Sequence, residues 1–171
     1  MRVEIYTVIK NAEYILPLYL KHYKRAFPGC VINVFDNNSE DKSIVLCKEA
    51  GCVIKNFPVY TEENLQYFKN NIWKNSTADW IIVCDVDELI QITQEELEKL
   101  DVDIVQFEGY NMVDVGNVVD PELMDHGVKS KPYNKCCLFK RNIKEINYAI
   151  GAHDCSPGKG LRYSVGEYKL L

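Results

Sequence analysis

The chain has 171 residues, of which 47% are hydrophobic and 26% are charged, values ordinary for one soluble globular domain. Its net charge of −5 excludes a general binder of nucleic acids or membrane surfaces, because such proteins need a basic patch. No apolar run approaches the roughly 20 residues that span a bilayer, and MRVEIYTVIKNAEY at the N-terminus lacks the apolar core of a signal peptide. We therefore expect a cytoplasmic protein without a transmembrane segment or a nucleic-acid partner.

The cysteines indicate reduced thiols. There are seven, an odd number, and their irregular spacing includes no C-x-x-C pair, so a structural zinc site is not expected. Most lie inside apolar runs such as SIVLC and WIIVC, where a free thiol behaves as a small hydrophobic side chain.

The chain begins with a strand pattern and a helix pattern. Residues 3–9 (VEIYTVI) are rich in β-branched side chains and predict a strand. Apolar residues at helical spacing follow in AEYILPLYLKHYKRAF, where Pro17 is tolerated only in the first helical turn. Residues 30–36 (CVINVFD) predict a second strand, which the turn-forming sequence DNNSED ends.

The same alternation continues after this turn. We expect Ser39 to be the N-cap of a helix that continues to about Ala50, with Gly51 as its C-terminal stop. Residues 52–57 predict a third strand, and EENLQYFKNNIWKNS predicts another amphipathic helix. The apolar side chains expected on one side of that helix are Leu65, Phe68, Ile72 and Trp73.

The stretch ADWIIVCDVDELIQI contains the fourth predicted strand and an unusually acidic end. Residues 80–84 are all apolar and predict a strand that is buried on both faces. Three carboxylates, Asp85, Asp87 and Glu88, then follow within four positions.

A capping box and a fifth strand complete this part of the chain. Thr93 and Glu96 form the box at the start of a short helix, and residues 102–110 predict the strand. Strands that alternate with helices imply an α/β fold whose mostly parallel central sheet is covered by helices on both faces. The pattern loosens beyond Tyr110, where a long polar connection precedes one further strand pattern, KCCLFKR, and a turn-rich tail.

The acidic turn suggests a metal site. In an open α/β sheet, ligands bind beyond the carboxyl ends of the strands, and Asp36 and Asp85 both end predicted strands. Asp85 and Asp87 are two residues apart, so in an extended segment they leave the same face and repel each other unless a cation lies between them. Mg²⁺ or Mn²⁺ suits such oxygen ligands and takes further ligands from substrate phosphates. The alternative is that the acids only cap the following helix.

These features together resemble a known family. A strand ending in Asp, as in VFDNNSEDKS, with WIIVCDVDEL downstream, resembles the GT-A fold glycosyltransferases that use nucleotide sugars, especially family two and its D-x-D-E relatives. The resemblance covers residues 3–110 well and the remainder loosely. It implies one domain over residues 1–171, in which about 1–110 bind the nucleotide sugar and metal and about 111–171 form the acceptor side. Relatives often continue beyond the equivalent of Leu171, so the chain is expected to be either truncated in that half or a short member of the family.

The resemblance also implies roles for single residues. The residues expected at the nucleotide sugar are Thr7, Lys10, Asn11, Asp36, Asn38, Asp85, Val86, Lys135 and Arg141, and the expected metal ligands are Asp85, Asp87 and His153. Asp36 should meet the base or ribose, and one of the basic residues in the later strand region, where Lys140 is a further candidate, should meet the diphosphate.

The expected reaction is transfer of the sugar to a hydroxyl of a glycan, glycoprotein or other acceptor, with inversion. Such a reaction needs a carboxylate that accepts the proton of the acceptor hydroxyl. Asp154 is the first candidate, followed by Asp114 and Glu108, although each fits a solvated loop acid equally well and a retaining mechanism stays open. We expect His22 to be structural, and His126 carries no signal.

Other functions fit the sequence less well. A degenerate domain that binds sugar nucleotides without turnover has the same motifs. A haloacid-dehalogenase-type phosphatase would have Thr or Val where Leu89 stands, and a nucleotidyltransferase would have a Gly-rich basic loop after the first strand. A calcium loop in DNNSEDKSIVLC fails because its sixth and twelfth positions are Asp41 and Cys47.

Overall fold

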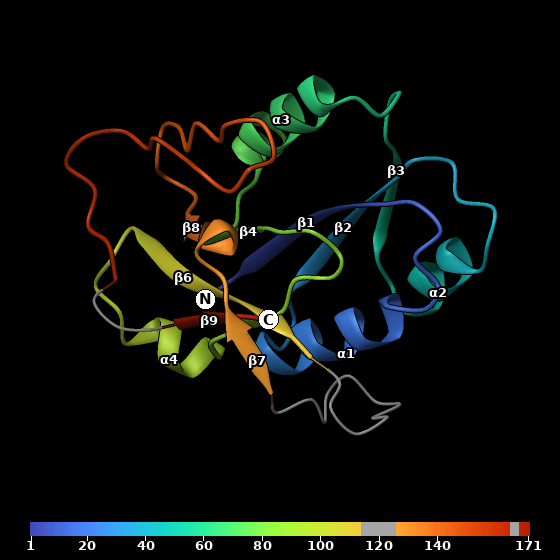
Figure 1. Cartoon of the computed structure of the whole chain (residues 1–171), viewed down its shortest axis with the longest axis horizontal. Helices are drawn as coiled ribbons and strands as arrows, with labels where there is room; N and C mark the ends of the chain where they lie inside the picture. The colour runs from blue at the N-terminus through green and yellow to red at the C-terminus, as the bar shows by residue number, and fades with distance from the viewer. Residues whose placement is uncertain (114–125, 165–167) are drawn as a thin grey trace.

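The computed structural model describes residues 1–113, 126–164 and 168–171 (Figure 1). Its strands are β1 (Val3–Ile9), β2 (Val31–Asp36), β3 (Val53–Asn56), β4 (Trp80–Val83), β5 (Ile90–Gln91), β6 (Ile104–Met112), β7 (Gly127–Lys129), β8 (Lys135–Lys140) and β9 (Tyr168–Leu170). Its helices are α1 (Leu16–Ala26), α2 (Ser43–Glu49), α3 (Glu62–Asn71) and α4 (Gln94–Glu98), with short 3₁₀ helices η1 (Ile72–Asn75) and η3 (Lys131–Tyr133). None of the helices in the described ranges is long and apolar enough to cross a membrane.

The strands form one mixed sheet in the order β3-β2-β1-β4-β8-β6-β9-β5, and β7 pairs with β6. The N-terminal half, β3-β2-β1-β4, is parallel throughout. The strand β8 returns antiparallel between β4 and β6, which the strand and helix alternation alone did not indicate. The predicted α/β class with a central, largely parallel sheet is confirmed.

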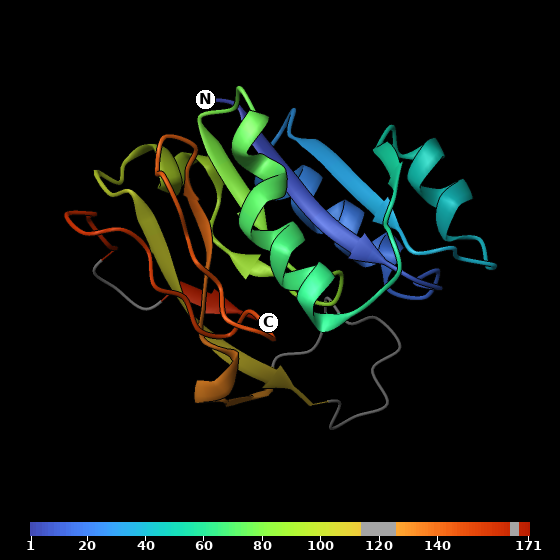
Figure 2. The same ribbon diagram turned by 90° about the horizontal axis from the view of Figure 1, so that it is seen from above.

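Helices cover both faces of the sheet, because apolar side chains of the central strands alternate between two cores. Ile5 and Ile82 point to the core shared with α1, α2 and α4, whereas Tyr6 and Ile81 point to the core shared with α3 and η1. Figure 2 shows α3 crossing one face of the parallel strands while α1 lies on the other. The carboxyl ends of β1, β2 and β4 therefore form one edge between the two helical layers.

Several local predictions are confirmed. Pro17 lies in the first turn of α1, and Thr93 and Glu96 form the expected capping box of α4. Gly51 follows α2 with a φ of 74°, a left-handed conformation that glycine adopts without strain. All seven cysteines are free thiols.

The predicted N-cap at Ser39 is wrong. Helix α2 begins at Ser43 with Lys42 as its N-cap, and the Ser39 hydroxyl instead accepts a hydrogen bond from the Asn11 backbone N–H at 2.9 Å. Ser39 thus ties the loop after β2 to the loop after β1. Asn11 contributes to the same tie, because its side-chain oxygen accepts a hydrogen bond from the Glu40 N–H at 2.8 Å.

Candidate active site

The acidic turn after β4 is held in one conformation from both ends. The Asp85 N–H donates to the Glu88 carboxylate at 2.9 Å, and the Glu88 N–H donates to the Asp85 carbonyl at 3.1 Å. From α1, the buried Tyr23 hydroxyl donates to the Glu88 carbonyl at 2.8 Å. Glu88 therefore braces the turn, while the side chains of Asp85 and Asp87 remain for other contacts.

Two buried lysines bind Asp85. Lys69 from α3 lies 2.7 Å from one carboxylate oxygen, and Lys135 from β8 lies 3.0 Å from the other and 2.5 Å from Glu88. Both lysines are only 3% exposed. Burial disfavours the charged form of Asp85, but the ammonium groups of Lys69 and Lys135 outweigh it and lower the pKa of Asp85 to about 2. Burial likewise acts against the charge on Lys135, whose pKa Glu88 and Asp85 nevertheless raise above its ordinary value.

This arrangement does not fit the predicted metal site. Asp85, Asp87 and His153 were the expected ligands, yet each Asp85 oxygen already accepts an ammonium hydrogen bond. Two like unit charges 4 Å apart repel by about 4 kcal/mol at an effective dielectric constant of 20, so a divalent ion on Asp85 would be repelled by both lysines. Within the described ranges no three His, Cys, Asp or Glu residues are grouped so that they could hold a metal ion. The prediction of Asp85 as a metal ligand is therefore at odds with the structure.

A cavity of about 330 Å³ lies beyond the ends of β1, β2 and β4. Its walls are largely apolar, and polar groups from the predicted donor-binding loop reach its rim. The lining residues are Val8, Ile9, Lys10, Asn11, Ala12, Ile15, Asn37, Tyr60, Leu65, Asp85, Val86 and Asp87. The structure thus brings together Lys10, Asn11, Asp85 and Val86 of the predicted donor-binding residues.

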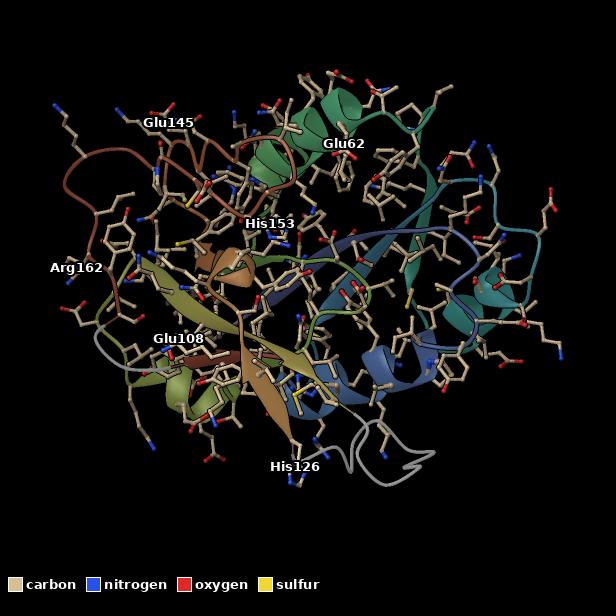
Figure 3. The ribbon with its side chains drawn as sticks, viewed as in Figure 1. Glu62, Glu108, His126, Glu145, His153 and Arg162 are labelled. Atoms are coloured by element: carbon tan, nitrogen blue, oxygen red, sulfur yellow. The ribbon has the colours of Figure 1, made fainter. Side chains whose placement is uncertain are left out.

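A second cavity, of about 250 Å³, shares Asp85 and Asp87 with the first. Its other lining residues are Glu88, Tyr110, Asn111, Tyr133, His153, Leu170 and Leu171. The exposed His153 ring packs edge-on against Tyr133 with 5.5 Å between ring centroids, near η3 in Figure 3. The structure places His153 in the same cavity as Asp87, and its predicted role as a metal ligand stays a prediction because no metal cluster forms in the described part. Asp87 is exposed, and its carboxylate has no hydrogen-bond or ion-pair partner among the described residues.

Two of the three candidate bases line a third cavity, of about 430 Å³, which shares His153 with the second. Asp154 is exposed there. One oxygen of Glu108, which Figure 3 labels, is bound by Lys129, and the other is buried without a hydrogen-bond partner in the described ranges. Asp114, the remaining candidate, lies outside the described residues.

Three predicted donor-binding residues lie beside the first cavity without lining it. Thr7 is 1% exposed, and its buried hydroxyl has no hydrogen-bond partner among the described residues. Asp36 is buried, and its carboxylate accepts the Ser39 N–H at 3.1 Å, so it shapes the loop after β2. Asn38 occupies a left-handed turn position with a φ of 56°, and Asn37 lines the cavity instead.

The three basic candidates for the diphosphate are all engaged by other groups, and Lys140 pairs with Asp103 at 3.6 Å. Lys135 is engaged by Asp85 and Glu88 and lines neither of the two cavities that contain Asp85. Arg141 lies at the opposite edge of the sheet, because β8 runs antiparallel to β4 and ends near the start of that strand. Its guanidinium donates to the backbone carbonyls of Lys74 and Ser76. The prediction of His22 as structural is consistent with its buried ring, whose Nε2 lies 2.9 Å from the Ile90 carbonyl oxygen.

Sequence reasoning missed Lys69, although a signal was present. Lys69 follows Leu65 by four residues and Phe68 by one, so it lies on the apolar face of its helix. A lysine on such a face needs a buried carboxylate partner, and Asp85 is that partner. Tyr60 was also missed because it belongs to no motif, and Asn37 was missed although it lies in the turn DNNSED.

No family model matches the sequence, and no curated protein is significantly similar to it. Solved structures are similar in fold. Residues 1–349 of TarS from S. aureus, in complex with UDP-GlcNAc, align over 96% of this chain and 58% of that one, with 14% identity and a TM-score of 0.51. A longer TarS structure aligns over 82% of this chain and 28% of that one, again with 14% identity, and a TM-score of 0.52. The chain therefore spans from about a quarter to somewhat over half of these TarS chains, and it has the GT-A fold of glycosyltransferases.

Proposed function

We propose that the protein transfers a sugar from a nucleoside-diphosphate sugar to a hydroxyl group of a glycan, glycoprotein or other acceptor. One observation carries this proposal: Asp85 and Asp87 form the shared wall of two cavities at the carboxyl edge of the parallel strands. Ligands of open α/β sheets bind at this edge. A donor that occupies the first cavity with its nucleotide would place its sugar at the two aspartates and an acceptor in the second.

The first cavity suits a nucleotide. Apolar side chains such as Leu65 and Val86 offer surface for a base, and Tyr60 adds an aromatic ring. Lys10, which also lines this cavity, would supply positive charge for the diphosphate. TarS, which shares the fold, is known in complexes with UDP and with UDP-GlcNAc, and these are therefore the first ligands to test.

The transfer step needs a base on the acceptor side. The hydroxyl oxygen attacks the anomeric carbon, the bond from that carbon to the diphosphate breaks, and a carboxylate accepts the hydroxyl proton. We assign this role to Asp154, because its exposed side chain lies beside His153, which lines both acceptor-side cavities. Asp154→Asn should leave nucleotide affinity unchanged and lower transfer by about 10²- to 10⁴-fold. Transfer at the wild-type rate would remove Asp154 as the base.

Release of nucleoside diphosphate tests the whole proposal. The protein is incubated with UDP-, GDP- and TDP-sugars, with and without a hydroxyl acceptor, alongside Asp85→Asn and a matched control, Asp101→Asn. Asp101 is a suitable control because its side chain is 85% exposed and contacts only Arg162 among the described residues. We expect one nucleotide to be released by the wild type and the control but not by Asp85→Asn. Binding without release from any donor would instead identify a sugar-nucleotide-binding domain that lacks turnover.

A further inference from the structure

The charges around Asp85 balance without a metal ion. Lys69 and Lys135 contribute two positive charges, and Asp85 and Glu88 contribute two negative charges, with nitrogen–oxygen distances between 2.5 and 3.0 Å. Both ammonium groups are buried, so water screens these contacts little. The group forms a neutral cluster that joins α3, the turn after β4, and β8.

The lysines lie outside the two cavities that Asp85 lines, although Lys135 lines the third cavity. Neither Lys69 nor Lys135 lines the cavities that Asp85 and Asp87 share, whereas Asp85 lines both. Each carboxylate oxygen can accept two hydrogen bonds, and each Asp85 oxygen already accepts one from an ammonium group. Because the Asp85 side chain is still 36% exposed, its remaining acceptor positions are open to a ligand.

Asp87 lines the same two cavities but differs from Asp85 in its partners. It is exposed, and no cation among the described residues pairs with it. The two carboxylates therefore have different environments: Asp85 is already neutralised, whereas Asp87 has no cationic partner in the part of the chain that the structure describes. A D-x-D motif in which both acids hold one divalent ion would require the lysines to withdraw from Asp85.

We propose that Lys69 and Lys135 replace a divalent cation at Asp85. They hold its carboxylate in position to accept a hydrogen bond from a hydroxyl group of the nucleotide-sugar donor. This inference rests on the proposed function and specifies its donor site. Lys69 and Lys135 are positioning residues, since they act through Asp85. The nucleotide then binds without a metal ion, and any ion that does bind is held by Asp87 without Asp85.

The experiment is a calorimetric titration of the whole chain with UDP, GDP and TDP, in EDTA and in Mn²⁺. The best-binding nucleotide should have the same affinity, within about twofold, in both conditions. In EDTA, Lys69→Met should weaken that affinity by roughly tenfold, as expected when a charged hydrogen-bonding group is lost. Mn²⁺ should restore part of the loss in this variant, because one Asp85 oxygen then lacks an ammonium partner and only Lys135 still repels an ion there. Lys74→Met is the matched control, since Lys74 is exposed on the next helical turn and its ammonium group bonds only Asn71 among the described residues.

Mn²⁺ binding gives a second readout that does not depend on the lysine variants folding. Electron paramagnetic resonance should show the same Mn²⁺ affinity for Asp85→Asn as for the wild type, and a lower affinity for Asp87→Asn. The inference is overturned if wild-type nucleotide binding disappears in EDTA and returns with Mn²⁺, or if Asp85→Asn loses Mn²⁺ as Asp87→Asn does. Absence of binding by every nucleotide in both conditions would overturn the proposed function itself, and the inference with it.

Discussion

Replacing Gly109 with alanine should displace the short helix that lines the acceptor side. A Cβ atom at Gly109 would lie 2.5 Å from the carbonyl carbon and oxygen of Tyr133, about 0.9 Å short of the 3.4 Å at which ordinary contact begins. The neighbouring backbone cannot easily give way. The Gly109 carbonyl accepts the Ser130 N–H at 2.8 Å, and the Gly109 N–H donates to the Asn134 side chain at 3.0 Å. Either these bonds lengthen or η3 moves by nearly 1 Å.

The size of the effect follows from this overlap. Overpacking of this kind costs about 1–3 kcal/mol. In a domain of this length that corresponds to a fall in melting temperature of about 2–12 °C. Tyr133 moves with η3, and its ring contacts His153 in the cavity that also contains Asp87. A displacement of 1 Å at a reacting centre can cost about 100-fold in rate, so transfer should fall further than stability alone explains.

The assays are thermal denaturation and nucleoside-diphosphate release, with Gly158→Ala as the control. A Cβ at Gly158 meets only a Glu145 carboxylate oxygen at 4.0 Å, so this variant should stay within about 0.5 kcal/mol of the wild type. If Gly109→Ala melts and reacts like Gly158→Ala, the close approach of η3 to β6 does not hold the acceptor side in place.

Three further predictions concern the supports of the site. Tyr23→Phe removes the hydrogen bond to the Glu88 carbonyl and should lower the free energy of unfolding, measured by urea denaturation, by about 1–3 kcal/mol. The control Tyr14→Phe, at an 84% exposed position, should not change this free energy measurably. The pKa of Asp85 is lowered to about 2, so its contribution to stability is present above the unfolded value near 3.9 and is lost as pH falls through about 2. The stability difference between the wild type and Asp85→Asn should accordingly be largest above about pH 4 and shrink toward pH 2, and a constant difference would contradict the ion pairing. Thr93→Ala should cost about 1 kcal/mol by removing the capping box of α4, and an unchanged urea midpoint would show that the cap contributes nothing.

The parallel half of the sheet could be predicted because its signals are local. The strands are runs of β-branched residues, and helices such as α1 show apolar side chains at a regular spacing. The strands β5 and β9, of two and three residues, are too short for any periodicity and form only because they pair with each other and β9 with β6. The position of β8 between β4 and β6 likewise depends on long-range pairing that no local pattern contains.

The candidate site likewise has features that the local sequence predicts and others that depend on long-range packing. Asp85 and Asp87 could be placed at the sheet edge because they directly follow a buried strand. Their different surroundings could not be predicted from the local sequence, because Lys69 lies 16 residues before Asp85 in the chain and Lys135 lies 50 residues after it. The sequence pattern alone made a metal ion the simplest partner for two close carboxylates, and only the packing of α3 and β8 supplies the competing ammonium groups.

The central claim is that a nucleotide binds in the first cavity, beside Asp85 and Asp87. A backbone amide NMR titration tests this claim most directly. Uniformly ¹⁵N-labelled protein is titrated with UDP-GlcNAc, and with GDP- and TDP-sugars if that ligand does not bind. We predict chemical-shift changes concentrated at residues 8–12, Asn37, Tyr60 and residues 85–87, which form the first cavity. Saturating shifts confined to another surface, such as the cavity around Phe57 and Tyr67, or no shifts with any donor, would contradict the account.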